Sequence, residues 1–396
     1  MSRLGAAALS TLVVGAFVSQ LGYAIVQPLL PFLLGRAGED VNQNTGLITA
    51  TYAGALVIFA PLWGRLADHW SRRLVLLIGL GGLAVALFIL SFVGNLTPLY
   101  AGLFLAGAFS AAIWPVALAI IADVEVDEQD RSRSFARIYV AVTVGFLVGP
   151  AIGGLLGRMW IAGMPVTGLP FLAVGAAAVI VLLIAARTVP MDKARNWPRP
   201  GHRPINHANL RSLILISLLA SWGLGTFEVG LTLRAARDFA LGPEIIGWMF
   251  VECMLVMTLV QLVVFSRRVP PSATRLLLAP SLALLGLALL LVGFAPDLVV
   301  LFAAVAVTAA ALGAISPVIG YWISLSAGAA QGAELGRQVA AVGLGQAVGS
   351  AVAGVLFGLG RAEGAFVAAA TVVGAGAALA MPLARRLPAT TRDPGG

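Results

Sequence analysis

The sequence predicts an all-α integral membrane protein with twelve transmembrane helices, from its apolar content, its long apolar stretches and its charge distribution. Hydrophobic residues make up 60% of the 396 positions and charged residues only 11%. Soluble domains average about 45–50% and about 25%, respectively. A soluble core has no room for so many apolar side chains, so the composition excludes an ordinary soluble protein.

The apolar stretches have the length that a membrane-spanning helix needs. About 20 mostly apolar residues cover about 30 Å of hydrocarbon at 1.5 Å per residue. The runs are continuous rather than alternating, which favours helices over a β-barrel. The first stretch is too long for the core of a cleaved signal peptide, so we expect it to be retained. The predicted spans are residues 8–34, 44–64, 74–94, 98–122, 134–157, 167–187, 211–233, 244–265, 274–294, 297–327, 335–359 and 363–387.

The positions of arginine and lysine predict the orientation. With the N-terminus inside, 20 of the 25 basic residues fall in segments on one side, and the remaining five are Arg36, Arg158, Arg234, Arg237 and Arg361. The positive-inside rule then places both termini in the cytoplasm of a cell with an inner, or plasma, membrane. This distribution explains the net charge of +8, so we expect the lipid bilayer and no nucleic acid as a partner. The single cysteine, Cys253, cannot form an intrachain disulfide.

A long polar segment between the sixth and seventh spans divides the chain. It predicts an N-terminal six-helix bundle over residues 1–187, a cytoplasmic linker over 188–210 and a C-terminal six-helix bundle over 211–396. Residues 144–154 (VGFLVGPAIGG) resemble residues 344–354 (LGQAVGSAVAG), which indicates an internal repeat. Two parallel repeats predict a substrate site near the bilayer midplane and alternating access.

Three motifs carry a resemblance to a known family. Residues 64–73 (GRLADHWSRR) resemble the loop signature of the major facilitator superfamily, with His69 and Ser71 in place of the usual arginine and glycine. Residues 21–31 (LGYAIVQPLLP) look like the first-helix motif of its twelve-helix drug and proton antiporters, and residues 145–154 are similar to their fifth-helix motif. The motifs occur in the family's order on the first, second and fifth of the twelve predicted spans, and the resemblance covers the whole length of the chain. The chain is therefore identified as resembling a drug:proton antiporter of this superfamily.

The resemblance implies a cytoplasmic gate at the loop signature. Gly64 allows close helix packing, and Asp68 can accept hydrogen bonds from the N-terminus of the eleventh helix. Asp123 is placed to pair with Arg72, and Arg73 lies beside it. The alternative is that the arginines only anchor the topology and that Asp68 is a solvated loop acid. We expect Asp68→Asn to abolish transport without loss of protein from the membrane.

The fifth-helix motif consists of Gly145, Gly149, Pro150, Gly153 and Gly154. Proline removes a backbone hydrogen bond and glycine removes bulk, so the motif predicts an interrupted or bent fifth helix. In the family this motif is more typical of antiporters than of symporters, and it therefore favours export. Ordinary helix packing, for which glycine is common in membranes, is the alternative.

Two acids lie within predicted spans, Glu228 in the seventh and Glu252 in the eighth. An ionisable group there costs about 2.5 kcal/mol or more and indicates a functional site. The two reach a similar depth, and two nearby carboxylates in a low dielectric do not both ionise easily, so we expect one to carry a proton. Hydrogen-bonded structure is the alternative. The family's fourth-helix arginine is replaced by Leu103, so coupling is expected to run through these acids instead.

The inner parts of the spans contain no lysine or arginine, which favours a neutral or cationic amphipathic substrate over a phosphate or dianion. An aromatic cavity with few polar groups suits such a molecule, whereas interfacial anchoring is the alternative for each tryptophan. The candidate cavity residues are Gln20, Tyr23 and Gln27 on one face of the first helix, Trp114 on the fourth, Trp222 and Phe227 on the seventh, and Tyr321 and Trp322 on the tenth.

The leading functional prediction is proton-coupled efflux of a small amphipathic molecule, with uptake or facilitated diffusion of a nutrient as the alternative. A receptor or an intramembrane enzyme is disfavoured, since His69, His202 and His207 all lie in predicted cytoplasmic segments and no metal-ligand spacing is present. The sequence also has no nucleotide-binding loop. We therefore expect no cofactor and no metal, and a monomer by analogy with the family.

Overall fold

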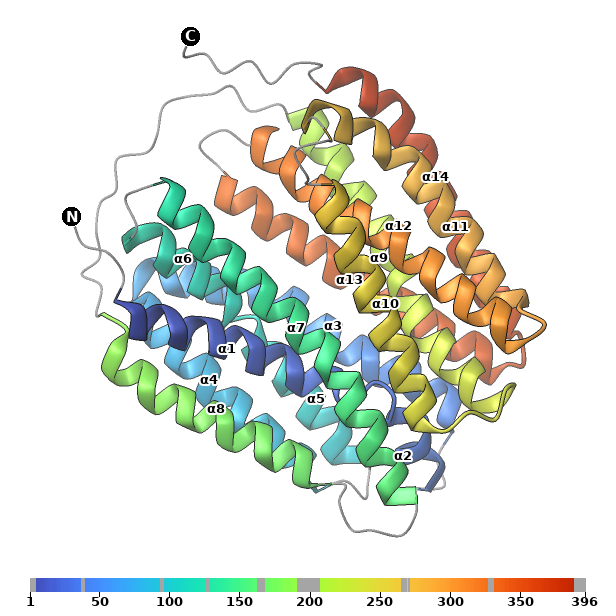
Figure 1. Ribbon diagram of the computed structural model, residues 1–396, viewed down its shortest axis with the longest axis horizontal. Helices are drawn as coiled ribbons and strands as arrows, with labels where there is room; N and C mark the ends of the chain where they lie inside the picture. The colour runs from blue at the N-terminus through green and yellow to red at the C-terminus, as the bar shows by residue number, and fades with distance from the viewer. Residues whose placement is uncertain are drawn as a thin grey trace. The chain divides into compact units, whose positions relative to one another are not determined.

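The computed structural model of the chain describes residues 5–36, 40–92, 96–124, 128–161, 168–190, 207–264, 269, 271–326 and 331–387. Helices are the only regular elements in these ranges (Figure 1). Twelve helical stretches among them are long and apolar enough to cross a bilayer. The predicted all-α membrane fold with twelve spans is therefore confirmed.

The helix ends lie within a few residues of the predicted spans for most of the chain. Before the linker come α1 (Ala6–Ala24), α2 (Leu30–Arg36), α3 (Val41–His69), α4 (Arg72–Leu90), α5 (Leu96–Ser110), α6 (Trp114–Val124), α7 (Glu128–Ile161) and α8 (Leu169–Thr188). After it come α9 (His207–Arg237), α10 (Pro243–Val264), the 3₁₀ helix η1 (Pro271–Leu277), α11 (Leu278–Phe294), α12 (Leu298–Ser326), α13 (Gln331–Gly358) and α14 (Ala362–Arg386).

Prolines break the first and the fourth spans. A proline ring clashes with the carbonyl four residues earlier, and α1 ends at Ala24, four residues before Pro28. A turn follows, and α2 then begins with Pro31 as its second residue, where proline is favoured. The fourth span breaks in the same way between α5 and α6, where Pro115 is the second residue of α6. The prediction of one continuous helix across residues 8–34 is therefore wrong.

By contrast, α7 runs from Glu128 to Ile161 without a break, although Pro150 lies inside it. The fifth helix is therefore not interrupted at this proline, and the predicted bend stays a prediction. Membrane helices tolerate an internal proline when neighbouring helices hold the segment in place. Here Gly149 packs directly against α1, since a Cβ at this glycine would contact Ala24 and the backbone nitrogen of Ile25.

The chain divides into two compact units. Unit 1 comprises residues 1–197 and 235–251, and unit 2 comprises residues 198–234 and 252–396. Unit 1 thus includes the end of α9 and the first part of α10. The predicted division into bundles 1–187 and 211–396 remains a prediction.

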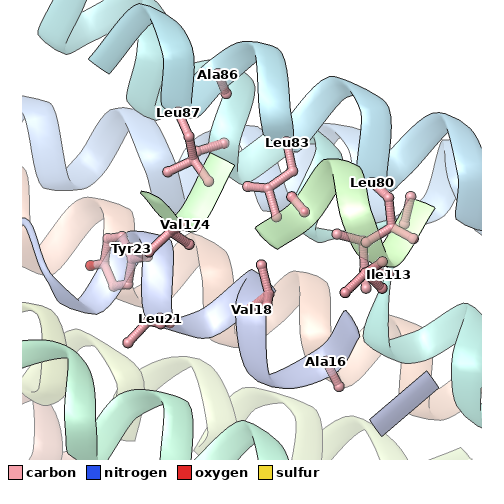
Figure 2. Packing of buried hydrophobic residues seen from close by; sticks show 14 of the residues in the cluster. Ala16, Val18, Leu21, Tyr23, Leu80, Leu83, Ala86, Leu87, Ile113 and Val174 are labelled. Atoms are coloured by element: carbon pink, nitrogen blue, oxygen red, sulfur yellow. The ribbon is translucent and has the colours of Figure 1, made fainter. Parts of the chain in front are cut away.

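In unit 1, α1 packs against both α7 and α8, and α4 packs against α5 and α8 (Figure 1). Apolar side chains from α1, α4 and α8 meet in the core of this unit (Figure 2). Leu80 and Leu87 of α4 are almost fully buried there, as are Ala16 and Val18 of α1. Burial of each large apolar side chain contributes to the stability that fixes α1.

In unit 2, α11 packs against α12 and α14 (Figure 1). Phe366 of α14 is fully buried and fits against glycines on two neighbouring helices. A Cβ at Gly293 of α11 would lie 2.8 Å from the Cβ of Phe366, and one at Gly230 of α9 would lie 2.5 Å from its ring. These close approaches are typical of helix contacts in membranes, where small residues replace bulky ones.

Large apolar side chains also cover much of the outer surface of the helices. In a soluble protein, exposed apolar patches of this extent would cause aggregation, whereas in a bilayer they face the lipid tails. They occur in both units, and examples that are more than half exposed are Val85, Phe88, Ile180, Leu183, Leu259, Leu262 and Leu287. The exposed surface therefore agrees with a multi-pass membrane protein.

Candidate functional site

The centre of the candidate site is the seam between α9 and α13 in unit 2. The two helices approach closely because glycines lie at their contacts. A Cβ at Gly225 of α9 would clash with the carbonyl oxygen of Gln346, and one at Gly345 or Gly349 of α13 would clash with the α9 backbone. Such contacts leave no room for a side chain between the two helix backbones. The helices are therefore held at a fixed separation, which also fixes the positions from which polar side chains beside the seam extend.

Two weak hydrogen bonds also cross the seam. The Thr226 hydroxyl donates to the carbonyl oxygen of Gly349 over 3.3 Å, and the Ser350 hydroxyl donates to that of Gly225 over the same distance. All of these residues are buried. The two bonds join adjacent residues of α9, Gly225 and Thr226, to adjacent residues of α13, Gly349 and Ser350.

Glu228 is held at this seam by an amide from the opposite helix. The Gln346 side-chain nitrogen donates to Glu228 Oε2 over 2.8 Å. Gln346 is buried and Glu228 is half-buried. The amide donor satisfies one acceptor of the carboxylate, so Gln346 is a polar partner of Glu228 across the seam.

Sequence reasoning did not identify Gln346 as a site residue, although it stands within the repeated segment 344–354. The available signal was an amide in the middle of an apolar span, since polar side chains there usually have a functional or structural partner. Its partner could not be inferred, because the separation of 118 residues from Glu228 reflects tertiary packing.

Glu252 lies on the neighbouring helix α10 and differs from Glu228 in its bonding. Its Oε2 is buried and has no hydrogen-bond partner among the described residues. A buried acceptor without a partner costs free energy, so it requires an explanation. The next residue, Cys253, is buried. That Glu228 and Glu252 reach a similar depth remains a prediction.

The aromatic candidates of unit 2 occupy different environments. Trp222 is half-buried, and its Nε1 is a buried donor without a partner among the described residues. Phe227 and Trp322 are almost completely buried, and the Trp322 Nε1 donates to the Thr274 hydroxyl over 3.0 Å. Tyr321 is half-buried and contacts Trp322 edge to face. Trp222 is thus the candidate with polar capacity still available.

The candidates of unit 1 include one correction. Gln20 and Tyr23 lie on α1 and are buried, and Tyr23 stacks on Tyr52 with ring centroids 3.8 Å apart. Gln27 is also buried but lies in the turn after Ala24, so the prediction that it continues the helical face is wrong. The reason is the proline that follows it, which ends α1 early.

Trp114, the remaining aromatic candidate of unit 1, is the first residue of α6. It is half-buried and contacts the ring of Tyr139 on α7, with centroids 6.3 Å apart. This position follows directly from the break in the fourth span, since the turn before α6 ends at Ile113.

The predicted gate is only partly described. The side chains of Asp68 and Asp123 lie outside the described part of the structure, so the predicted pair between Asp123 and Arg72 does too. Arg72 donates to the carbonyl oxygen of Ala119, one turn before Asp123. Gly64 is exposed, and a Cβ there would meet no described atom within 4 Å, so the expected close helix contact is not found among these residues.

Arg73 has a structural partner that was not predicted, the carbonyl oxygen of Ala186 near the end of α8. Arg275 makes the matching contact in unit 2, where it donates to the carbonyl oxygen of Leu387 just beyond α14. The two arginines are 202 residues apart and their acceptors 201 apart. In both contacts an arginine donates to a carbonyl oxygen at a helix C-terminus, where the helix dipole also favours a cation.

The fifth-helix motif packs against α1 and the turn after it on three successive turns of α7. A Cβ at Gly145 would lie 2.7 Å from the carbonyl oxygen of Phe17, and Cβ atoms at Gly149 and Gly153 would clash with Ala24 and Ile25. Gly154 faces the opposite way, toward the carbonyl oxygen of Pro243 at the start of α10. The motif glycines therefore serve as close-packing positions.

Comparison with known proteins supports the family resemblance. The sequence model described as "Major Facilitator Superfamily" matches residues 12–233. Among curated relatives, multidrug resistance protein 1 of Bacillus subtilis (strain 168) is 26% identical over 65% of this chain and 66% of its own length. Quinolone resistance protein NorA of Staphylococcus aureus (strain COL) is 25% identical over 86% of this chain and 87% of its own. The class B tetracycline resistance protein of Escherichia coli is 36% identical, but only over 35% of either chain.

Solved structures agree on the fold. The human organic anion transporter MFSD10 (TETRAN) has a TM-score of 0.73 and 22% identity over 95% of this chain and 99% of its own. A POT family transporter has a TM-score of 0.77 and 14% identity over 96% of each chain. At these identities the likeness concerns the arrangement of helices and says nothing of the substrate.

Proposed function

This chain belongs to the Major Facilitator Superfamily, and we propose that it is a proton-coupled exporter of a small amphipathic molecule that is neutral or cationic. The named relatives are resistance proteins toward multiple drugs, quinolones and tetracyclines, which supports export of drug-like compounds. We further propose that it works in the inner, or plasma, membrane by alternating access, with both termini in the cytoplasm.

The hydrogen bond between Gln346 and Glu228 is the observation that carries the coupling proposal. An acid inside a membrane-spanning helix is costly, and one held by an amide across a glycine-packed seam can change protonation without leaving its position. Glu228 is then the proton carrier. Glu252, with one buried oxygen unpartnered among the described residues, is available to the substrate or to a second proton.

The polar capacity of the site fits the proposed substrate class. Trp222 offers a donor and an aromatic face, and Glu252 offers an acceptor that can bear a negative charge. A molecule with an aromatic body and an amine would satisfy both. Organic anions would meet two acids and no cation from these residues, which disfavours them.

Counterflow in proteoliposomes tests the proposal. Purified protein is reconstituted with an imposed pH gradient and screened with cationic dyes, tetracyclines, sugars and siderophore-like acids. We expect a cationic dye or a tetracycline to be concentrated against its gradient in exchange for protons. Accumulation of a sugar together with protons would instead establish the uptake alternative, and gradient-independent equilibration would establish a facilitator.

The loop signature is proposed to act as the cytoplasmic gate, through Asp68. Asp68→Asn is expected to abolish transport while the protein stays in the membrane, because the neutral side chain is a weaker acceptor for helix N–H groups. Glu363→Gln, at an exposed acid of α14, is the matched control and is expected to transport normally. Normal flux in Asp68→Asn would contradict the gate.

A further inference from the structure

A half-open cavity of about 350 Å³ lies at the start of α9 and α13, and the proposed transport chemistry makes no use of it. It belongs entirely to unit 2. Its volume is within the range of small-ligand sites, about 300–1,000 Å³. Its lining includes Leu218, whose carbonyl oxygen forms the first close contact of the α9–α13 seam with Gly345. The cavity is therefore the end of the seam, where the two helices separate.

The mouth of the cavity has an excess of basic side chains. His207 and Arg211 of α9 and Arg337 of α13 line it, together with a single acid, Glu334. The Glu334 side chain is only 6% exposed and is already paired with Arg337. This ion pair positions the Arg337 guanidinium at the mouth, where its side chain is 67% exposed. The lining contains no second acid that could pair with Arg211 or His207.

The inner wall of the cavity is apolar. It is formed by successive turns of α9 that include Leu210, Ile214 and Leu218. From the first to the last of these, the wall is about 12 Å long at 1.5 Å per residue. A ligand that fits the whole cavity therefore has an anionic end at the mouth and an apolar part along α9.

We propose that this cavity binds an anionic phospholipid, with the phosphate headgroup at Arg211 and Arg337 and the start of an acyl chain along the apolar wall. Basic pockets between transmembrane helices are known to bind anionic headgroups, and arginine suits phosphate because it can donate two parallel hydrogen bonds. The helix begins at the bilayer face that the arginine distribution predicts to be cytoplasmic. A lipid of that leaflet supplies both the charge and the apolar chain.

The competing explanation is that these arginines are general interfacial anchors, as basic residues at helix ends commonly are. The C-terminal turn of α14 provides a matched control, because Arg385 and Arg386 are exposed basic residues that do not line the cavity. Neutralising either pair of arginines removes the same charge. Only the cavity pair is expected to matter for specific lipid binding.

The experiment measures lipid binding to the purified full chain in neutral detergent, by titration with phosphatidylglycerol or phosphatidylcholine and by native mass spectrometry. We expect saturable phosphatidylglycerol binding by the wild type and by Arg385→Gln/Arg386→Gln. Arg211→Gln/Arg337→Gln is expected to bind phosphatidylglycerol about 30-fold more weakly, because each arginine is expected to strengthen the binding of an anionic headgroup about fivefold. Arg211→Gln alone keeps the Glu334–Arg337 pair intact and is expected to lose about fivefold, which guards against a folding defect in the double variant.

Three results would overturn the proposal. Equal loss of phosphatidylglycerol binding in the cavity pair and the control pair would show general electrostatic attraction. Displacement of the bound lipid by inorganic phosphate at equal concentration would show a site for a free phosphate rather than for a lipid. Binding of phosphatidylcholine as tightly as phosphatidylglycerol would likewise contradict the assigned role of the two arginines.

Discussion

The α1–α7 pair of unit 1 and the α9–α13 pair of unit 2 have the same packing but different chemistry. In each pair, two glycines of the second helix lie directly on the backbone of the first, Gly145 and Gly149 on α1 and Gly345 and Gly349 on α9. The 200-residue repeat in the sequence is therefore also a repeat in how the helices pack. What differs is the side chains placed around this common contact.

The contacts give the register of the comparison. Gly145 meets Phe17 and Leu21, and Gly345 meets Leu218 and Trp222, so at this contact the α9 residues correspond to α1 residues 201 positions earlier. Gly149 and Gly349 depart from this register, since Gly149 meets Ala24 and Ile25 whereas Gly349 meets Trp222. Extending the register of the first contact along the chain pairs Glu228 with residue 27, a glutamine in the turn after α1. In unit 1 a proline follows that position and the helix has ended, whereas α9 continues and carries its acid within a helix.

The partner position differs in the same way. Phe146 of α7 contacts Tyr23 edge to face, with centroids 6.2 Å apart, and 200 residues later Gln346 of α13 binds Glu228. One pair therefore has an aromatic contact at this position and the other a hydrogen bond to an acid. Under the proposed function, this difference places the coupling acid in unit 2.

The largest expected effect comes from removing the acid that distinguishes the two pairs. Glu228→Gln is expected to reduce gradient-driven concentration of a transported dye by about tenfold or more, because the amide cannot exchange a proton. Glu363→Gln serves as the control, an acid exposed on α14. Dye accumulation is measured in proteoliposomes with an imposed pH gradient, and wild-type accumulation in Glu228→Gln would remove the distinction between the pairs.

The shared packing is tested by adding a methyl group at equivalent glycines. Gly149→Ala and Gly349→Ala are each expected to destabilise the protein by about 1–3 kcal/mol, because the new Cβ meets backbone that cannot move away. Gly374→Ala is the control, since a Cβ there meets nothing within 4 Å. Thermal unfolding in detergent measures the effect. A loss in only one of the two pairs would show that the packing is not equivalent.

The partner of the acid is tested through the pH profile of transport. Gln346→Leu removes the donor to the Glu228 carboxylate, so the pH profile of transport is expected to differ from that of the wild type. The matched change in unit 1, Phe146→Leu, is expected to leave the profile unchanged. Identical profiles for both variants would reduce Gln346 to a packing residue.

The smallest effect is expected in the aromatic pair of unit 1. Tyr52→Leu removes the stacked contact with Tyr23 and is expected to cost about 0.5–1.5 kcal/mol of stability without altering the pH profile. Thermal unfolding and the transport assay are run on the same preparation. A shift in the pH profile would show that the chemistry extends into unit 1.

The sequence was sufficient to predict the membrane fold because the hydrophobic length of a spanning helix is set by the bilayer itself. It failed where proline acted locally. A new helix begins at Leu30, two residues after Pro28, and another begins at Trp114, directly before Pro115, whereas Pro150 lies inside one continuous helix. A proline's effect depends on its neighbours in space, which the sequence alone does not give.

The candidate site was predicted in part for a similar reason. Glu228 and Glu252 could be identified from the sequence, because an ionisable residue in an apolar membrane-spanning stretch is costly and therefore rare. Gln346 was overlooked, since an amide costs less and its partner lies on another helix. The lipid cavity was equally hidden, because Arg211 and Arg337 look like ordinary topology anchors until the two helices are placed side by side.

Direct counting of protons provides the sharpest test of the claim that the acids of unit 2 couple substrate to protons. Ethidium, as a cationic probe, is added to concentrated protein in weakly buffered detergent, and proton release is followed with a pH indicator dye. The account predicts release by the wild type and by Phe146→Leu, and none by Glu228→Gln/Glu252→Gln although ethidium still binds at higher concentration. Undiminished proton release by the double variant would contradict it.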